Sequence, residues 1–304
     1  MNLELEELRA FVAVAETLHF GEAAQRVGVS QPALTKRIQK LEAKLGGALF
    51  SRHTRGVSMT PAGVLLQERA TNLLAEAAHI EAISRMAMRG EAGALRVGLG
   101  LGAVTAGVPN VLMQFRKRYP HVHVTVRDMA SAEQLAALRR EEIDVAFVRL
   151  PVAESAGLRI TPVIEERLEV VTKSTERFRG KLRDVADQPF IILSRSTSGA
   201  YHEHVLATCR AAGFHPRVVQ EANQIYTILV LVAAGLGVAL APSSARHMRL
   251  PGVRFSEAGV PEAAWRIGMV WREAARTSRD AVVANFAGLA RAHFRAAASG
   301  SVFQ

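Results

Sequence analysis

One short segment of the chain, QPALTKRIQK, carries side chains suited to reading a nucleic acid. With helical spacing, Gln31, Thr35 and Gln39 lie on one face together with Lys36 and Lys40, while leucine and isoleucine occupy the other. Amide, hydroxyl and ammonium groups can hydrogen-bond to base edges, and the major groove of DNA is wide enough to admit a helix. The segment is therefore predicted to contact base pairs.

The residues before and within this segment predict how the helix is held. A preceding short helix, with Phe20 and Ala24 on its apolar face, ends at Gly28, which favours a tight turn. Ser30 is a good N-cap for the second helix, and Pro32 falls in the first turn, where a missing N–H costs nothing. The pattern is typical of a helix-turn-helix. An amphipathic helical hairpin with a solvated basic face is the alternative.

Basic residues dominate the stretch from Arg26 to Arg55, where seven lysines and arginines accompany a single acid, Glu42. Such an excess attracts a phosphate backbone whatever the base sequence. Arg52 and Arg55 lie next to Gly56, which predicts a short β-hairpin, or wing, whose arginines meet phosphates; a polar surface loop is the alternative. The residues predicted to bind DNA are Gln31, Pro32, Thr35, Lys36, Arg37, Gln39, Lys40, Arg52 and Arg55.

A long helix is predicted from Thr60-Pro61 to Arg89-Gly90, because proline suits a first turn and glycine suits a helix end. Its apolar residues follow a heptad spacing, which favours close pairing with a second helix. A helix packed only on its own domain would also show one stripe, but this helix is about 43 Å long, too long for a small domain to cover. The predicted seam is Leu66, Ala70, Leu73, Ala77, Ile80, Ser84 and Ala87.

From Ala94 onwards, short apolar runs alternate with helical ones, which predicts parallel sheets with crossover helices. The uncharged stretch from Ala222 to Ala245 has an apolar core of fourteen residues. This is short of the roughly 20 residues that a membrane span needs, so the stretch is interpreted as buried helix and strand. The expected strands are LRVGL, VHVTV, VAFV, LEVV, FIIL, VALA and IGMVW. Helices are expected to begin near Val104, Ala132, His202, Tyr226 and Arg279.

The composition fits a globular chain of two or three domains, with 304 residues, 49% of them hydrophobic and 22% charged. Residues 1–92 hold eleven basic and ten acidic side chains, so +9 of the net charge of +10 lies beyond them. The basic second part suggests an anionic partner, although solubility alone could explain the charge. The single cysteine, Cys209, and an acidic N-terminal segment unlike a secretory signal predict a cytoplasmic protein without an intrachain disulfide.

The chain resembles the LysR-type transcriptional regulators. The resemblance rests on FGEAAQRVGVSQPALTKRIQKLEAKLGGALFSR and RGVSMTPAG, and further along on LRVGL, EQLAALRREEIDVAFVR and LVAAGLGVALAP. It implies an α/β protein that is not an enzyme and has no cofactor, and that binds a pseudo-palindromic double-stranded operator as a homodimer or homotetramer. The implied parts are a winged helix-turn-helix domain (1–60), a linker (dimerisation) helix (61–92) and a two-lobed effector-binding domain resembling periplasmic binding proteins (93–304). Within the effector-binding domain, lobe one is expected at 93–163 and 269–304, and lobe two at 164–268.

The resemblance also implies that a small-molecule effector binds between the lobes, at the carboxyl ends of strands. Ser131, expected at a helix N-terminus, and Arg149, at a strand end, suit a small carboxylic acid. A structural role for Arg149, paired with Glu165 or Glu166, is the alternative. Where the family often has a hydroxyl, Gly102 lets a ligand approach the backbone closely. The expected effector-binding residues are Gly102, Ala103, Thr105, Ser131, Arg149, Ser198, Gly199, Tyr201 and Tyr226.

A nicotinamide-dependent oxidoreductase is one competing hypothesis. Gly98, Gly100 and Ala103 fit a GxGxxA pattern after a strand, and Asp128 ends the next strand, where a ribose-binding acid belongs. The pattern is weak by itself, because Gly98 lies inside the strand and no Tyr-x-x-x-Lys accompanies it.

A metal-responsive regulator is a further hypothesis. His121 and His123 share one face of an expected strand, and His202 and His204 form a second pair. Histidines at this spacing can ligate zinc or nickel together, but exposed polar histidines are the more common explanation and no cysteine lies nearby. No metal site is therefore predicted.

Overall fold

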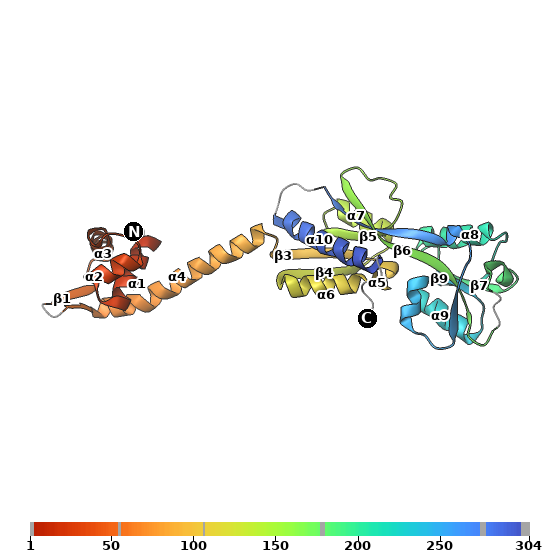
Figure 1. The fold of residues 1–304 in the computed structure, drawn as a ribbon, viewed down its shortest axis with the longest axis horizontal. Helices are drawn as coiled ribbons and strands as arrows, with labels where there is room; N and C mark the ends of the chain where they lie inside the picture. Colours follow the sequence, from red (N-terminus) through yellow and green to blue (C-terminus); the bar gives the residue numbers. More distant parts are fainter. Residues whose placement is uncertain (1–2, 54–55, 106, 177–179, 274–277, 299–304) are drawn as a thin grey trace. The chain divides into compact units, whose positions relative to one another are not determined.

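The structure is a computed structural model in which residues 3–53, 56–105, 107–176, 180–273 and 278–298 are described. Its contacts divide the chain into two compact units, Met1–Met86 and Ala87–Gln304. The ribbon in Figure 1 shows that the first unit is mainly helical and that the second is built on β-sheets covered by helices.

The first unit contains the predicted helix-turn-helix and wing. Gly28 has a φ of 72° in the turn, and the Ser30 hydroxyl caps the next helix by accepting from the N–H of Ala33 at 3.4 Å. Both motifs are confirmed, although Arg55 and the side chain of Arg52 lie outside the described residues. The elements are α1 (Leu5–Thr17), α2 (Phe20–Arg26), α3 (Gln31–Leu45), the antiparallel hairpin of β1 (Phe50–His53) and β2 (Gly56–Met59), and α4 (Pro61–Met88).

The predicted long helix is confirmed as α4, and its apolar stripe has two different environments. Near its start, Ala70 is buried and Leu66 packs against the core of α1–α3. Further along, Leu73 and Ile80 are 49% and 57% exposed. The first part of the predicted seam therefore covers the helix's own domain, and the later part is open to solvent in the single chain.

In the first lobe of the second unit, a sheet lies between helices. Alternate residues of its central strand face two separate clusters: Val145 and Phe147 pack under α6 and α10, while Ala146 and Val148 pack with α7. The ring of Phe286 joins the first cluster, edge-on to Phe147. The elements are β3 (Ala92–Leu99), α5 (Leu101–Thr105), α6 (Val108–Arg118), β4 (His121–Asp128), α7 (Ser131–Arg139), β5 (Val145–Arg149), β11 (Ala264–Arg272) and α10 (Ser278–Ala298).

The second lobe is connected to the first by a long strand, β6 (Leu158–Lys173), which runs from one lobe into the other (Figure 1). The remaining elements are η1 (Leu182–Val185), β7 (Pro189–Leu193), α8 (Gly199–Ala211), β8 (Arg217–Ala222), α9 (Ile225–Ala234), β9 (Ala239–Pro242), η2 (Ser243–Met248), β10 (Val253–Glu257) and η3 (Pro261–Ala263). Strands β7 and β8 are parallel, whereas β9 and β10 pair antiparallel with β6.

The expectation of parallel sheets holds for only part of the molecule. Strand β3 is parallel to β4 and β5, but β11 is antiparallel to both β5 and β6. No crossover helix lies between β5 and β6, because the chain continues from lobe one directly into the long connecting strand. The helix expected near Val104 is two helices, α5 and α6, of which α6 begins at Val108.

The uncharged stretch from Ala222 to Ala245 is buried helix and strand, as predicted. It contains α9 and β9, and the side chains of Ile228, Leu229 and Val232 are fully buried. Among the described residues, no helix is long and apolar enough to cross a membrane.

Candidate functional site

The outward face of α3 carries the side chains predicted to read DNA. Leu34, Ile38 and Leu41 are buried against the neighbouring helices, which directs the opposite face to solvent. Five of the nine predicted DNA contacts line a shallow hollow of about 560 Å³ on this face: Gln31, Pro32, Thr35, Lys36 and Gln39. The sequence therefore places amide, hydroxyl and ammonium donors side by side on an exposed helix, where they can reach a groove.

Two other predicted contacts, Arg37 and Lys40, are bound by acids of α1 and by its N-cap residue, Glu4. Arg37 Nη2 lies 3.0 Å from Glu6 Oε2, and Lys40 Nζ lies 2.8 Å from Glu4 Oε1 and 3.1 Å from Glu7 Oε1. The hydrogen bond that Lys40 donates to Glu4, followed by that to Glu7, raises the pKa of Lys40. These cations therefore anchor α3 on α1. The cluster of acids at the start of the first helix was the signal in the sequence that could have indicated this role.

The second candidate site is a cavity of about 620 Å³ between the two lobes. Parallel strands β3, β4 and β5 end at its lobe-one side, and α7 begins there. Seven of the nine predicted effector-binding residues line it: Gly102, Ala103, Ser131, Arg149, Ser198, Tyr201 and Tyr226. Gly199 is not among the lining residues, and the side chain of Thr105 lies outside the described part of the structure.

Arg149 lies at the wall of this cavity, held by aromatic rings. Its guanidinium carbon is 4.4 Å from the centre of a Trp265 ring and 5.2 Å from that of Tyr201, and Nη1 lies 3.5 Å from the carbonyl oxygen of Ala200. Its backbone N–H donates to the Ser131 hydroxyl at 3.2 Å. Burial lowers the pKa of Arg149, but a guanidinium remains charged at any ordinary pH. The site therefore contains a desolvated cation.

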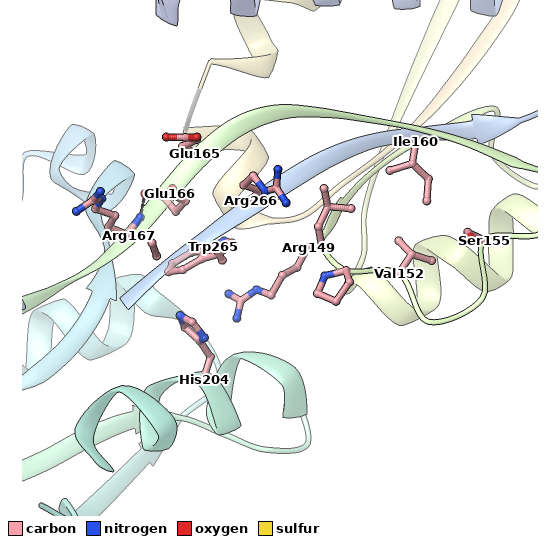
Figure 2. A pocket seen from close by; sticks show the side chains of 13 residues that line it. Arg149, Val152, Ser155, Ile160, Glu165, Glu166, Arg167, His204, Trp265 and Arg266 are labelled. Atoms are coloured by element: carbon pink, nitrogen blue, oxygen red, sulfur yellow. Dashed lines mark hydrogen bonds between the residues drawn. The ribbon is translucent and has the colours of Figure 1, made fainter. Parts of the chain in front are cut away.

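The alternative role for Arg149, an ion pair with Glu165 or Glu166, is not what the structure contains. The Glu166 carboxylate instead accepts hydrogen bonds from the hydroxyls of Ser243 and Ser244. Among the described residues, no carboxylate forms an ion pair with Arg149. Its guanidinium contacts ring faces (Figure 2) and a carbonyl, and Glu166 attracts it without forming an ion pair, which leaves it able to pair with an anion in the cavity.

Sequence reasoning missed several polar or aromatic residues of the cleft, among them Trp265, Asn223 and Gln224. Trp265 lies near the start of strand β11, and Asn223 and Gln224 follow β8, whose residues are nearly all exposed and lack an apolar period. Thr197 Oγ1 donates to Asn223 Oδ1 at 3.1 Å, which links two loops of lobe two. Polar residues directly after RVVQEA were the available signal, since ligands gather at carboxyl ends of strands.

Two of the expected residues also contribute to packing. A Cβ at Gly102 would lie 2.9 Å from Cδ1 of Ile267, so the glycine, which lines the cleft, also gives room to the end of that side chain. Tyr201 is buried, with its hydroxyl donating to the carbonyl of Leu240 at 3.0 Å, so much of its ring serves the fold and Arg149. Tyr226, by contrast, is 53% exposed at the cavity.

Comparisons with known proteins assign both parts of the chain to one family. Residues 5–64 match the family "Bacterial regulatory helix-turn-helix protein, lysR family", and residues 88–295 match "LysR substrate binding domain". The chain belongs to the LysR family of bacterial transcriptional regulators. It is therefore a DNA-binding regulator with an effector-binding domain and not an enzyme, and the nicotinamide hypothesis is wrong.

Individual LysR-family proteins are similar over nearly the whole chain. The regulator YnfL of Escherichia coli is 33% identical over 89% of this chain and 93% of its own, and IlvR of Caulobacter vibrioides is 34% identical over 90% and 95%. The crystal structure of CbnR covers 95% of this chain and 100% of its own, with 28% identity and a TM-score of 0.85. A second structure, of full-length CbnR in complex with its target DNA, matches this chain with a TM-score of 0.81.

Gly98, one of the glycines that suggested a nucleotide-binding loop, has a packing role in this LysR-family fold. Gly98 lies inside β3, and a Cβ there would meet Ile143 Cδ1 at 2.8 Å. One histidine of the second pair also has a structural role. His202 is buried, and its Nδ1 lies 2.9 Å from the carbonyl oxygen of Leu193. Within the described ranges, no three His, Cys, Asp or Glu side chains are grouped closely enough to hold a metal.

Proposed function

We propose that this LysR-family regulator reads a pseudo-palindromic operator with α3 and responds to a small carboxylic acid bound in the cleft between its lobes. For DNA, the proposal assigns base contacts to Gln31, Thr35 and Lys36, and phosphate contacts to Arg37 and to the wing arginines, Arg52 and Arg55. Its support is the exposed donor face of α3 and the wing beside it. Because its target is chromosomal DNA, we place the protein in the cytoplasm.

The proposed assembly is a dimer formed by α4, with effector domains joining dimers into a tetramer. Its main support is the row of exposed large apolar side chains along α4, because exposed apolar surface of this kind marks interaction sites. On α4 these are Val64, Leu65, Leu73, Ile80, Ile83 and Met88. The second unit also exposes large apolar side chains, among them Met113, Val126, Val218, Val219 and Val230. A two-fold dimer presents two copies of α3, which requires two half-sites in the operator.

The carboxylate proposal rests chiefly on one observation, the desolvated Arg149 without a carboxylate partner among the described residues. An anion in the cleft would pair with its guanidinium through charge-assisted hydrogen bonds. Helices α7 and α8 begin at the same cavity with Ser131 and Ser198, where free N–H groups and the helix dipole favour negative charge. Two acids, Asp128 and Glu133, lie exposed at the rim and would limit how many charges the ligand carries.

A thermal-shift screen of small carboxylic acids against their amides tests this effector class. A ligand at about a hundred times its dissociation constant should stabilise the protein by roughly 2.7 kcal/mol, which is easily measured. We expect stabilisation by acids, preferably flat ones that can lie against Tyr226, and not by amides. Ser131→Ala should weaken the effect, whereas Ser256→Ala, in β10 and outside the cleft, should leave it unchanged. Stabilisation by the amides alone would contradict the proposal.

A further inference from the structure

The acids of α1 and of its N-cap form ion pairs with most cations of the helix-turn-helix. The pairs are Arg26 with Glu16, Arg37 with Glu6, and both Lys40 and Lys44 with Glu4 and Glu7. The shortest N–O distance of each cation is between 2.6 and 3.0 Å. Among the described residues, Lys36 is the one lysine or arginine of α2 and α3 without an ion pair.

The charge of the whole first part of the chain agrees with this pairing. Residues 1–92 hold eleven basic and ten acidic side chains, so the excess is a single positive charge. DNA-binding domains usually carry a clear positive excess, because attraction to phosphates supplies nearly all of their sequence-independent affinity. Here the cations that could supply this affinity are counterbalanced by acids of the same domain.

The two outer pairs are weak enough to open. The side chains of Arg37 and Glu6 are 37% and 61% exposed, and those of Lys40 and Glu4 are 51% and 53% exposed. Ion pairs in such exposed positions contribute little to stability. A DNA phosphate can therefore displace these carboxylates, but the phosphate then gains less than it would from an unpaired cation. Glu7 is different, because its side chain is only 2% exposed and belongs to the packed contact of the helices.

We propose that Glu4 and Glu6 limit the affinity of this protein for DNA of arbitrary sequence, by holding Lys40 and Arg37 in internal ion pairs. The inference rests on the proposed role of α3 in reading DNA. A complex with arbitrary DNA depends almost wholly on cations near phosphates, and the two acids reduce the number of such cations. Hydrogen bonds from the uncharged side chains of α3 to base edges are not affected. The share of the binding free energy that comes from base contacts is therefore larger than in a protein with unpaired cations.

Glu4→Gln with Glu6→Gln tests the proposal, because glutamine keeps the shape of glutamate without its charge. Binding of the full-length protein to a duplex of random sequence is followed by fluorescence anisotropy over a series of salt concentrations. The logarithm of the binding constant should fall more steeply with the logarithm of the salt concentration, by about 0.9 for each released cation that reaches a phosphate. At low salt, the affinity should rise by roughly threefold or more. Circular dichroism should show an unchanged fold, since the buried Glu7 is retained.

The matched control is Glu22→Gln with Glu68→Gln, which removes two charges from exposed acids that form no ion pair among the described residues. It should bind random DNA with the salt dependence of the wild type. A second comparison places Glu4→Gln and Glu6→Gln in a protein that also carries Arg37→Met and Lys40→Met. The acid substitutions should have little effect there, because the cations that they release are gone.

The proposal is overturned if the acid variant has the salt dependence of the wild type, or if the control pair steepens it equally. It is also overturned if the acid substitutions have their full effect without Arg37 and Lys40. Selection from a randomised library separates this inference from the proposed function. An acid variant that selects the wild-type motif with an unchanged salt dependence contradicts only the inference, whereas the absence of any motif in the wild type contradicts the reading role of α3.

Discussion

The basic side chains of α3 differ in their partners, and this difference decides what each can contribute to DNA binding. Lys36 is exposed and forms no ion pair among the described residues, so its ammonium is available to a base edge. Lys40 and Lys44 instead share the acids of α1, and Lys44 Nζ lies 2.7 Å from Glu7 Oε1. A DNA phosphate must compete with these acids for Lys40.

The donors of α3 could be predicted from sequence, because helical periodicity alone decides which face is exposed. Their internal partners could not, because Glu4 and Lys40 meet only after two helices pack. The same limit applies to the cleft. Arg149 was expected at a strand end, but its stacking on Trp265 depends on the pairing of β5 with β11, which are far apart in the chain.

Glu7 provides a prediction at this scale, since it is a buried carboxylate at the contact of α1 with α3. Burial opposes its ionisation, but hydrogen bonds from Lys44 and Lys40 leave its pKa below the ordinary value of 4.5. A group with a lowered folded-state pKa contributes stability above that ordinary value and loses it as the pH falls through the folded pKa. We expect Glu7→Gln to destabilise the first unit by roughly 1–3 kcal/mol at neutral pH, and by less in acid.

Hydrogen–deuterium exchange of α1 and α3 measures this loss within the full chain, because it reports local opening. Glu22→Gln is the matched control, an exposed acid of the same unit without an ion pair among the described residues. It should exchange like the wild type at both pH values. Equal protection of α1 in Glu7→Gln and in the control would show that the buried carboxylate does not stabilise the contact.

Among the elements, α4 shows how one apolar stripe serves two purposes. Its first turns cover the core of the first unit through Leu66 and Ala70, and its later turns leave Leu73 and Ile80 in solvent. Heptad spacing predicted the stripe, but periodicity cannot say where the helix leaves its own domain. The strands show a similar limit, since β8 is mostly exposed, β10 is at most half-buried, and both lack the apolar runs by which the others were found.

For assembly, we predict that Leu73→Glu with Ile80→Glu splits the dimer, because an unpaired charge in a packed seam is costly. Both side chains are exposed in the single chain, so the monomer should keep its fold. Ala75→Glu with Ala82→Glu is the control, since these exposed alanines have the same spacing on the opposite face. Light scattering that found an intact oligomer in the seam variant would contradict a dimer formed by α4.

At the scale of the whole molecule, the second unit is suited to sensing by binding rather than by redox chemistry. Cys209, the only cysteine, is buried in α8, and burial raises the pKa of its thiol to about 12. Thiol oxidation requires the thiolate and access, so this residue is inert. The resemblance in the sequence predicted both units, whereas the shape and charge of the cleft depend on how the lobes pack.

The most direct test of the central claim is selection of bound duplexes from a randomised DNA library by the purified protein, with wild type and Lys36→Ala compared. The account predicts a shared pseudo-palindromic motif for the wild type. Losing one base contact should cost about 1–3 kcal/mol and relax specificity at one position in each half-site. An unchanged ratio of affinities for the selected motif and for random DNA in Lys36→Ala, or no shared motif at all, would contradict the assignment of α3 as the element that reads DNA.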